Sequence, residues 1–348
     1  MKKSLLALAA LTAFAGAASA QSSVTLFGIV DQSVNSIKNG SQSQKLLSSD
    51  MLNSNRFGVR GVEDLGGGLR AGFWLESGLA PDVGTAGGGN GQSGVTAFWN
   101  RRATVSLMGG FGEVRLGRDY VVTFSNRAAY DPFGFNGIAH MGLIESTLGS
   151  GAITQVRANN VVGYTLPALG GVFGGVQAAA GEGNAGWKYI GGRLGYAGGP
   201  VSVSAATSQT STATTNKYKQ TNVGASFNAG FLTVMGMYDK VTYGNSDQKH
   251  FLIGATVPFG ASTLKFSYNK ASGNLNGVSS DSLGAKLFGI GYQYDLSKRT
   301  AIYATYGSLN NDGNTSTGAN FVLTGLTGVT MTRGATSSGY NLGIRHSF

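Results

Sequence analysis

Segments of about ten residues in which apolar and polar side chains alternate recur along the chain, and they constrain its fold more than any other feature. In LRAGFWLE, residues 69–76, an extended chain points Leu69, Phe73 and Leu75 to one side and Trp74 and Glu76 to the other. In a soluble sheet the apolar face packs on a core. In a membrane barrel the apolar face meets lipid, and the polar face lines a water-filled lumen.

The connections between these segments alternate between short turns and long polar loops. Short turns are predicted at 66–68, 109–111, 167–170, 198–200, 228–230, 258–261 and 296–298. Long loops are predicted near 38–53, 80–97, 120–157, 182–186, 210–218, 243–248, 272–284 and 309–338. Seven turns and eight loops join sixteen strands. A sandwich has no reason to gather its short turns at one end, whereas an even-numbered up-and-down barrel in a membrane does.

The N-terminus predicts export. Two lysines precede a short apolar stretch that ends in Ala-Ser-Ala at 18–20, which is the pattern of a cleaved secretory signal peptide. The stretch is shorter than the ~20 residues that a spanning helix needs. We therefore expect a signal peptide at 1–20 and a single barrel domain at 21–348.

Composition narrows the function classes. The chain has no cysteine, which excludes a disulfide framework and thiolate chemistry. Its 57 glycines among 348 residues far exceed the usual ~7%, and they suit tight turns and strands that approach other backbones closely. The net charge of +10 points to anionic solutes or anionic lipid as partners. Because no basic cluster is interleaved with aromatic residues, nucleic acid is not an expected partner.

Four segments resemble the Gram-negative general porins of the beta-proteobacterial type. They are SSVTLFGIVD, SNRFGVRGVEDLGGGLRAGFWLESG, NRRATVSLMGGFGEVRLGRDY and the terminal YNLGIRHSF. The resemblance spans the mature chain and implies an all-β fold, a 16-stranded antiparallel transmembrane β-barrel whose long third loop folds into the lumen. It also implies a homotrimer in the bacterial outer membrane, and a terminal Phe348 that the barrel assembly machinery recognises.

Candidate site residues follow from the same resemblance. A pore selects at its narrowest part, where fixed charges focus the electric field on a passing ion. The family places a basic cluster on the barrel wall at positions that match Arg56, Arg101 and Arg157, facing acidic groups of the third loop. Asp131, in the motif YDPFG, and Glu145 are the acidic candidates. The alternative for each arginine is a solvated lumen or rim residue without a special role.

Two expectations concern the faces of the strands. Arg102, the alternate-face neighbour of Arg101, is expected at the rim, and Trp74 is a candidate for the interfacial aromatic girdle of a barrel. The first segment, SVTLFGIVDQSV, is mixed on both faces, so its register stays open.

Rival functions have weaker support. The three histidines, at 140, 250 and 346, lie near no G-x-S-x-G elbow and have no paired ligand spacing, so we expect no enzyme, no metal site and no cofactor. A structural or adhesive barrel usually has a small, plugged lumen, whereas sixteen strands leave it open. A substrate-specific channel would differ only in its constriction. We predict a passive diffusion pore for small hydrophilic solutes and inorganic ions, with anion preference, in contact with outer-membrane lipid and lipopolysaccharide.

Overall fold

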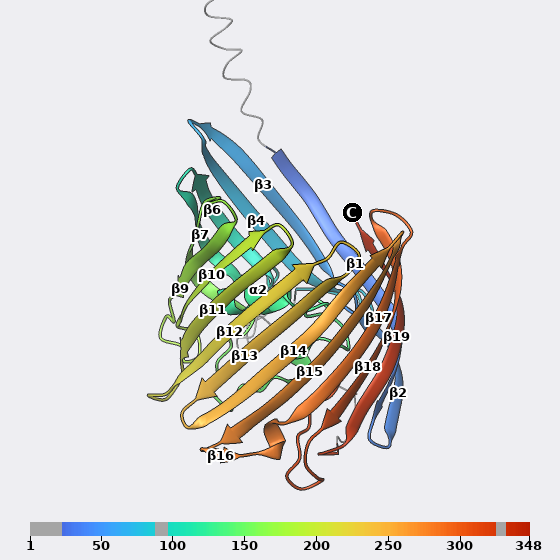
Figure 1. The fold of residues 1–348 in the computed structure, drawn as a ribbon. Coiled ribbons are helices and arrows are strands. Elements are labelled where there is room, and N and C mark those ends of the chain that lie inside the picture. Colours follow the sequence, from blue (N-terminus) through green and yellow to red (C-terminus); the bar gives the residue numbers. More distant parts are fainter. Residues whose placement is uncertain (1–22, 88–96, 325–331) are drawn as a thin grey trace, which may run out of the picture.

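The computed structural model describes residues 23–87, 97–324 and 332–348 as one antiparallel sheet that closes on itself (Figure 1). The predicted signal peptide lies outside the described residues. The wall consists of sixteen strands: β1 (Ser23–Asn39), β3 (Arg56–Gly66), β4 (Leu69–Ala80), β6 (Arg102–Gly109), β7 (Gly112–Tyr120), β8 (Arg157–Thr165), β9 (Val172–Ala179), β10 (Tyr189–Gly198), β11 (Val201–Ser211), β12 (Lys217–Asn228), β13 (Thr233–Tyr243), β14 (Ser246–Phe259), β15 (Ser262–Leu275), β17 (Ala285–Asp295), β18 (Thr300–Asn311) and β19 (Thr336–Ser347).

Three further strands are present. One of them shares a position in the wall with β3, and the other two lie in loops. β2 (Gln42–Ser49) lies end to end with β3, because both pair with β1. β5 (Thr85–Ala86) and β16 (Val278–Ser279) form short hairpins on the ends of β4 and β15. The predicted architecture of sixteen antiparallel strands is therefore confirmed.

The first and last strands close the barrel. β1 pairs with β19 from Ile29 opposite Ser347 to Asn39 opposite Ser337. The terminal Phe348 exchanges two backbone hydrogen bonds of 3.1 Å with Gly28, so the ladder continues to the last residue. Closure leaves each wall strand with a neighbour on both sides, which a sheet in lipid requires because no water is present to satisfy a free edge.

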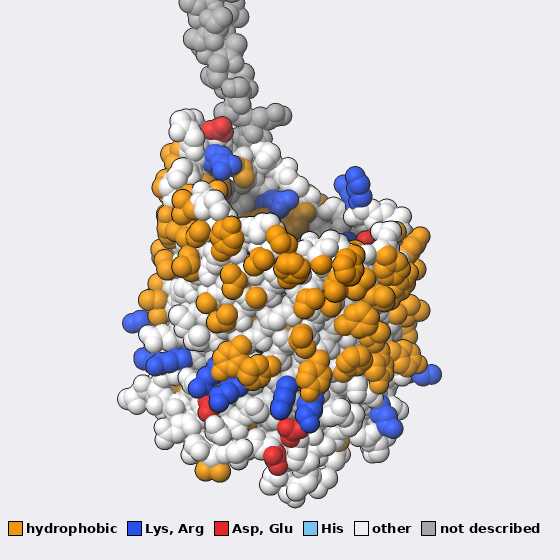
Figure 2. Space-filling model, viewed as in Figure 1, with side chains coloured by type: hydrophobic (Ala, Val, Ile, Leu, Met, Phe, Trp, Pro, Cys, Tyr) orange, Lys and Arg blue, Asp and Glu red, His pale blue; other side chains and the backbone are white. Residues whose placement is uncertain are grey.

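The side chains alternate between lipid and lumen as the period-two pattern predicts. On β14 and β15, Phe251, Ile253 and Tyr268 are exposed on the outside, whereas Leu252 and Asn269 are buried inside the barrel. The outer surface carries a broad apolar band (Figure 2). The register of the first strand, which its sequence left open, places polar residues toward the inside, where Asp31, Ser33 and Asn35 are buried.

The seven predicted short turns are found, and they lie at the end of the barrel where the C-terminus is marked (Figure 1). The loop predicted at 38–53 differs from the expectation. There the chain turns at residues 40–41 and returns at once as β2, so most of the expected loop is a strand. β2 pairs with the second half of the long β1, from Gln42 opposite Asn39 to Ser49 opposite Gln32.

No helix among the described residues is long and apolar enough to span a membrane.

The alternation makes a prediction about stability. Ile253 is 60% exposed on the outer surface near the middle of β14, so Ile253→Arg would place a guanidinium in lipid. We expect it to lower the free energy of unfolding by about 2–4 kcal/mol. Gln293→Arg, on the lumen face of β17 beside Asp295, is the matched control, and we expect it to change the free energy of unfolding little. Urea unfolding in lipid vesicles measures both, and equal losses would contradict the assigned faces.

Candidate functional site

The third loop, residues 121–156, leaves the wall after β7, passes through the inside of the barrel and rejoins the wall at β8 (Figure 1). It contains the helix α2 (Val122–Ala129) and the 3-10 helix η1 (Met141–Ile144). One face of α2, including Thr123 and Asn126, is buried against β10, β11 and β12. The loop therefore narrows the lumen.

Polar contacts fasten the loop to the wall. Asn126 Nδ2 donates to Asn222 Oδ1 at 2.8 Å, and Asn222 Nδ2 donates to the carbonyl of Thr123 at 3.2 Å. Further along, Ser267 Oγ donates to the carbonyl of Ala139 at 2.9 Å. These groups are buried, so their hydrogen bonds offset the cost of removing them from water.

Glycines in the wall make room for the YDPFG motif and the residues that follow it. A side chain on Gly224 of β12 would overlap the ring of Tyr130, and one on Gly254 of β14 would overlap Pro132. On β17, Gly289 is crowded in the same way by Ala139. Part of the glycine excess is thus explained by close approach of the loop, a use of strand glycines that the composition suggested.

Arg56, Arg101 and Arg157 are brought together although they are far apart in the sequence. Glu76 Oε1 accepts from Arg101 Nε at 2.6 Å and lies 3.5 Å from Arg56 Nη1. The hydroxyl of Tyr120 accepts from Arg101 Nη2 at 2.6 Å and from Arg157 Nη2 at 2.7 Å. We call these three arginines with Glu76 and Tyr120 the arginine cluster.

The arginine cluster carries an excess of positive charge. Arg56 and Arg101 share the carboxylate of Glu76, whose second oxygen accepts from Trp74 Nε1 at 3.0 Å, whereas Arg157 joins the cluster through the hydroxyl of Tyr120. The ring of Tyr120 stacks on Phe124 of α2, with ring centroids 5.3 Å apart, so the cluster lies where the wall meets the third loop. Fixed cations that line a confined aqueous path attract anions and repel cations.

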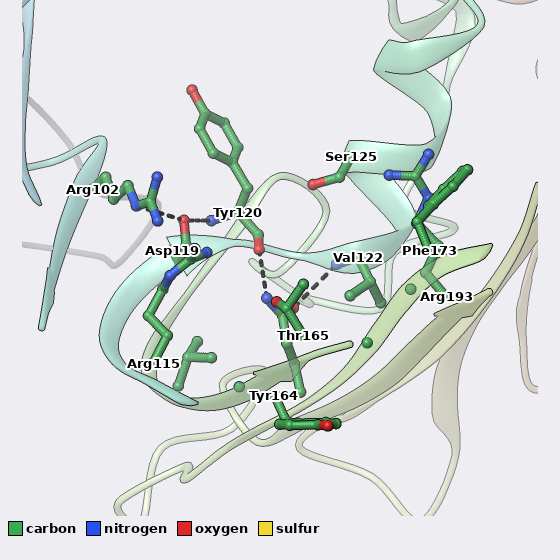
Figure 3. Close-up of a pocket in the computed structure, with 15 residues that line it drawn as sticks. Arg102, Arg115, Asp119, Tyr120, Val122, Ser125, Tyr164, Thr165, Phe173 and Arg193 are labelled. Atoms are coloured by element: carbon green, nitrogen blue, oxygen red, sulfur yellow. Dashed lines mark hydrogen bonds and ion pairs between the residues drawn. The ribbon is translucent and has the colours of Figure 1, made fainter. Parts of the chain in front are cut away.

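A second group lines the wall beside the cluster, and in it two arginines are paired with the carboxylates of Asp119 and Glu113. Arg102 lies 3.4 Å from Asp119, and Arg115 lies 2.6 Å from the other oxygen of the same carboxylate. Figure 3 shows both side chains pointing toward Asp119, with Arg193 across the same cavity of about 330 Å³. Arg102 is therefore a lumen residue and not a rim residue.

Trp74 also faces the lumen and takes no part in the outer girdle. Its ring lies under two guanidinium groups, with Arg60 Cζ at 4.8 Å and Arg102 Cζ at 4.6 Å from the ring centroid. The alternation in residues 69–76 predicts Trp74 on the polar side of its strand, and this register outweighs the general preference of tryptophan for interfaces.

The two acidic candidates of the third loop are engaged by groups other than the arginine cluster. Asp131 accepts backbone N–H bonds from Phe133 at 2.8 Å and from Met141 at 3.0 Å. Glu145 lies 2.5 Å from Arg127 Nη1, and that guanidinium is almost fully buried. The arginine cluster finds its carboxylate in Glu76 of the wall.

Burial shifts the pKa values of two titratable groups of the loop in opposite directions. It raises the pKa of Asp131 to about 6, against the two backbone N–H bonds that favour the charged form. It lowers the pKa of His140 to about 4, with Arg127 adding to the effect. His140 is therefore neutral at pH 7, and its Nδ1 accepts from the N–H of Gly142 at 3.2 Å.

Glu76 and Tyr120 were not singled out from the sequence. For Glu76 a signal existed, because the alternation in residues 69–76 put it on the polar side of its strand. Nothing in the pattern marked Tyr120, because its role depends on how the third loop leaves the wall.

Comparisons with known proteins agree with this geometry. A family model described as Gram-negative porin matches residues 7–314. The chain is 37% identical to outer membrane porin protein 32 of Delftia acidovorans and 29% identical to an outer membrane porin protein of Bordetella pertussis, and both alignments cover all of each chain. A solved structure entitled anion-selective porin from Comamonas acidovorans is 35% identical, with a TM-score of 0.81 over 94% of this chain and 100% of that one. OmpT of Vibrio cholerae, 16% identical with a TM-score of 0.67, shares the fold and covers 94% of this chain and 98% of its own.

The buried ion pair of the third loop predicts how the loop is held. Arg127→Leu would leave Glu145 partly buried without its cation, which costs about 3–5 kcal/mol for a buried pair. We expect the third loop to detach and become cleavable by protease while the barrel stays folded. Arg333→Leu, in the last loop, is the control. A loop as resistant as that of the unmodified protein would contradict the assigned role.

The opposed pKa shifts predict opposed effects of pH. Between about pH 4 and pH 6 the folded state binds an extra proton at Asp131, so this group lowers the free energy of unfolding as pH rises. In much the same pH window the unfolded state binds an extra proton at His140, so this group raises the free energy of unfolding as pH rises. The free energy of unfolding of Asp131→Asn, taken relative to the unmodified protein, should therefore rise with pH across this window. That of His140→Gln should fall with pH. Each slope is expected to reach up to about 1.4 kcal/mol per pH unit.

Urea unfolding at a series of pH values measures these slopes, with Asp64→Asn, at an exposed position near the end of β3, as the control. Parallel curves for all four proteins would contradict the prediction.

Proposed function

The chain belongs to the Gram-negative porin family, and from that membership we propose that its lumen conducts small anions in preference to cations. A general porin is a non-enzymatic β-barrel of the outer membrane through which small solutes pass.

The observation that carries the proposal is the arginine cluster. Arg56 and Arg101 share the carboxylate of Glu76, and Arg157 joins them through Tyr120, at the place where the third loop narrows the lumen. A guanidinium stays charged at any physiological pH and presents a planar set of donors that suits carboxylate and phosphate. The solved relative entitled an anion-selective porin supports the same direction of preference.

The mechanism needs no cofactor and no energy source. An anion that enters the lumen exchanges part of its water shell for the N–H groups of the cluster, whereas a cation meets the same groups as repulsion. Arg102 and Arg115, on the neighbouring wall, are matched by the carboxylates of Asp119 and Glu113, so the excess positive charge lies in the arginine cluster. Permeation then follows the concentration gradient, and the third loop limits the size of the solute.

We propose an indirect role in the constriction for the acidic residues of the third loop. Asp131 accepts two backbone N–H groups of its own loop, and Glu145 pairs with Arg127 and accepts from Gln220 at 3.2 Å. These contacts support a role in shaping the loop that faces the arginine cluster, while Glu76 partly neutralises the cluster.

The remaining proposals concern assembly and surroundings. We propose that residues 1–20 are a signal peptide removed on export and that residues 21–348 form a homotrimer surrounded by outer-membrane lipid and lipopolysaccharide. We also propose Phe348 as the residue that the barrel assembly machinery recognises. Its ring packs against Gly28 and is 42% exposed, so the terminal aromatic is accessible at the barrel edge.

Removing two charges of the cluster tests the proposed selectivity. Arg56→Gln with Arg101→Gln should lower the anion-to-cation permeability ratio several-fold and move the reversal potential toward that of a cation channel. Folding should change little, because lumen substitutions tune selectivity. Planar-bilayer recordings under a potassium chloride gradient measure the ratio.

The matched control removes the same charge outside the lumen, with Lys298→Gln and Arg299→Gln in the exposed turn between β17 and β18. Identical reversal potentials for the two double variants would overturn the proposed residue roles.

A further inference from the structure

Lysines form a row on the outer surface of five consecutive wall strands. The inward neighbours of these lysines are buried, which fixes their own side chains on the outer face. The members are Lys219 of β12, Lys240 of β13, Lys249 of β14, Lys270 of β15 and Lys286 of β17. We call them the outer lysine row.

The strand register sets like charges opposite one another. Lys240 is the cross-strand partner of Lys249, and Lys270 is that of Lys286. Directly opposite residues on one face have Cβ atoms roughly 4.5–5.5 Å apart, and like charges there destabilise a sheet. A structure that keeps two such pairs side by side gains from an anion between them.

No protein carboxylate supplies that anion. Within the described residues, none of the ion pairs involves a lysine of the outer lysine row. Asp247 lies two residues from Lys249 on the loop side, and its Oδ1 accepts from Asn274 at 2.9 Å. The row is therefore left with its positive charge toward the surroundings of the barrel.

An aromatic residue accompanies each of four lysines, two residues nearer the middle of its strand. These residues are Tyr238, Phe251, Tyr268 and Phe288, and the last three are 43–53% exposed. The rings of Tyr238 and Phe251 lie 4.9 Å apart. Exposed aromatic girdles mark the edge of the apolar band of a barrel, at the level where lipid headgroups begin. The lysines lie two residues further along their strands, which is at most about 7 Å, and this distance places them at the depth of the lipid headgroups.

Figure 2 shows the same arrangement, with Lys and Arg side chains gathered along the lower margin of the apolar band and few acidic ones among them. That margin is on the side of the long loops, the end opposite the short turns (Figure 1). Long loops of bacterial barrels are extracellular, so the outer lysine row lies in the outer leaflet.

We propose that the outer lysine row binds the phosphate groups of lipopolysaccharide, with one phosphate between Lys240 and Lys249 and another between Lys270 and Lys286. This inference rests on the proposed placement in the outer membrane and gives the lipid contact its residues. Lysine binds phosphate as a compact point charge, and the aromatic residues below the row pack against the acyl chains. A free phosphate ion would satisfy the lysines equally well, but it has no acyl chain that the aromatic residues could contact.

The test measures lipid binding by the delipidated full-length barrel in detergent, with EDTA present to remove bridging cations. The probe is lipid A with two phosphates, compared with the same lipid lacking phosphate and with inorganic phosphate, by native mass spectrometry. We expect Lys240→Gln with Lys249→Gln, and separately Lys270→Gln with Lys286→Gln, each to weaken binding of bisphosphorylated lipid A about 20-fold.

The control is again Lys298→Gln with Arg299→Gln, which removes equal charge at the opposite end of the barrel. The inference would be overturned if both lysine variants bound bisphosphorylated lipid A as tightly as this control does. It would also be overturned if the unmodified protein bound the lipid that lacks phosphate as tightly as bisphosphorylated lipid A. Displacement of lipid A by inorganic phosphate at the same concentration would also overturn it, because the site would then select the ion alone.

Conductance in planar bilayers separates this inference from the proposed function, because the outer lysine row lies outside the lumen. Unchanged conductance with lost lipid binding supports the inference. Unchanged conductance with unchanged lipid binding refutes it and leaves the anion-selective pore intact.

Discussion

The need to satisfy every backbone N–H and C=O in lipid governs this structure. A sheet in hydrocarbon has no water to complete a free edge, so β1 must pair with β19, and their ladder extends to the terminal Phe348. Closure forces each strand to present one face to lipid and the other to the lumen. The alternating pattern, the polar interior and the position of the arginine cluster all follow from that arrangement.

A closed barrel of sixteen strands leaves an interior too wide to select by itself, and the third loop supplies the narrow part. The loop enters the lumen because the wall has glycines where Tyr130 and Pro132 approach, and because buried amides such as Asn126 and Asn222 find partners. Its charges are largely used in holding its shape. The wall therefore provides the unbalanced charge, and selectivity is separated from the contacts that hold the loop.

Much of the fold could be predicted from the sequence, because period-two alternation and turn residues are local signals. The seven short turns and the faces of most strands follow from them, whereas the turn at residues 40–41 does not, because the polar segment after it resembles a loop. The cluster of Arg56, Arg101 and Arg157 could be suggested only through resemblance, since their meeting depends on barrel register. The environment of Asp131 depends on the path of the third loop, which no local pattern encodes.

The most direct test of the central claim is the reversal potential of the unmodified protein in a planar bilayer under a potassium chloride gradient, at low and at high salt. Fixed arginines predict anion selectivity that weakens as the Debye length falls from ~10 Å at 0.1 M to ~3 Å at 1 M. A preference for cations, or selectivity that is the same at both salt concentrations, would contradict a lumen whose charge is set by the arginine cluster.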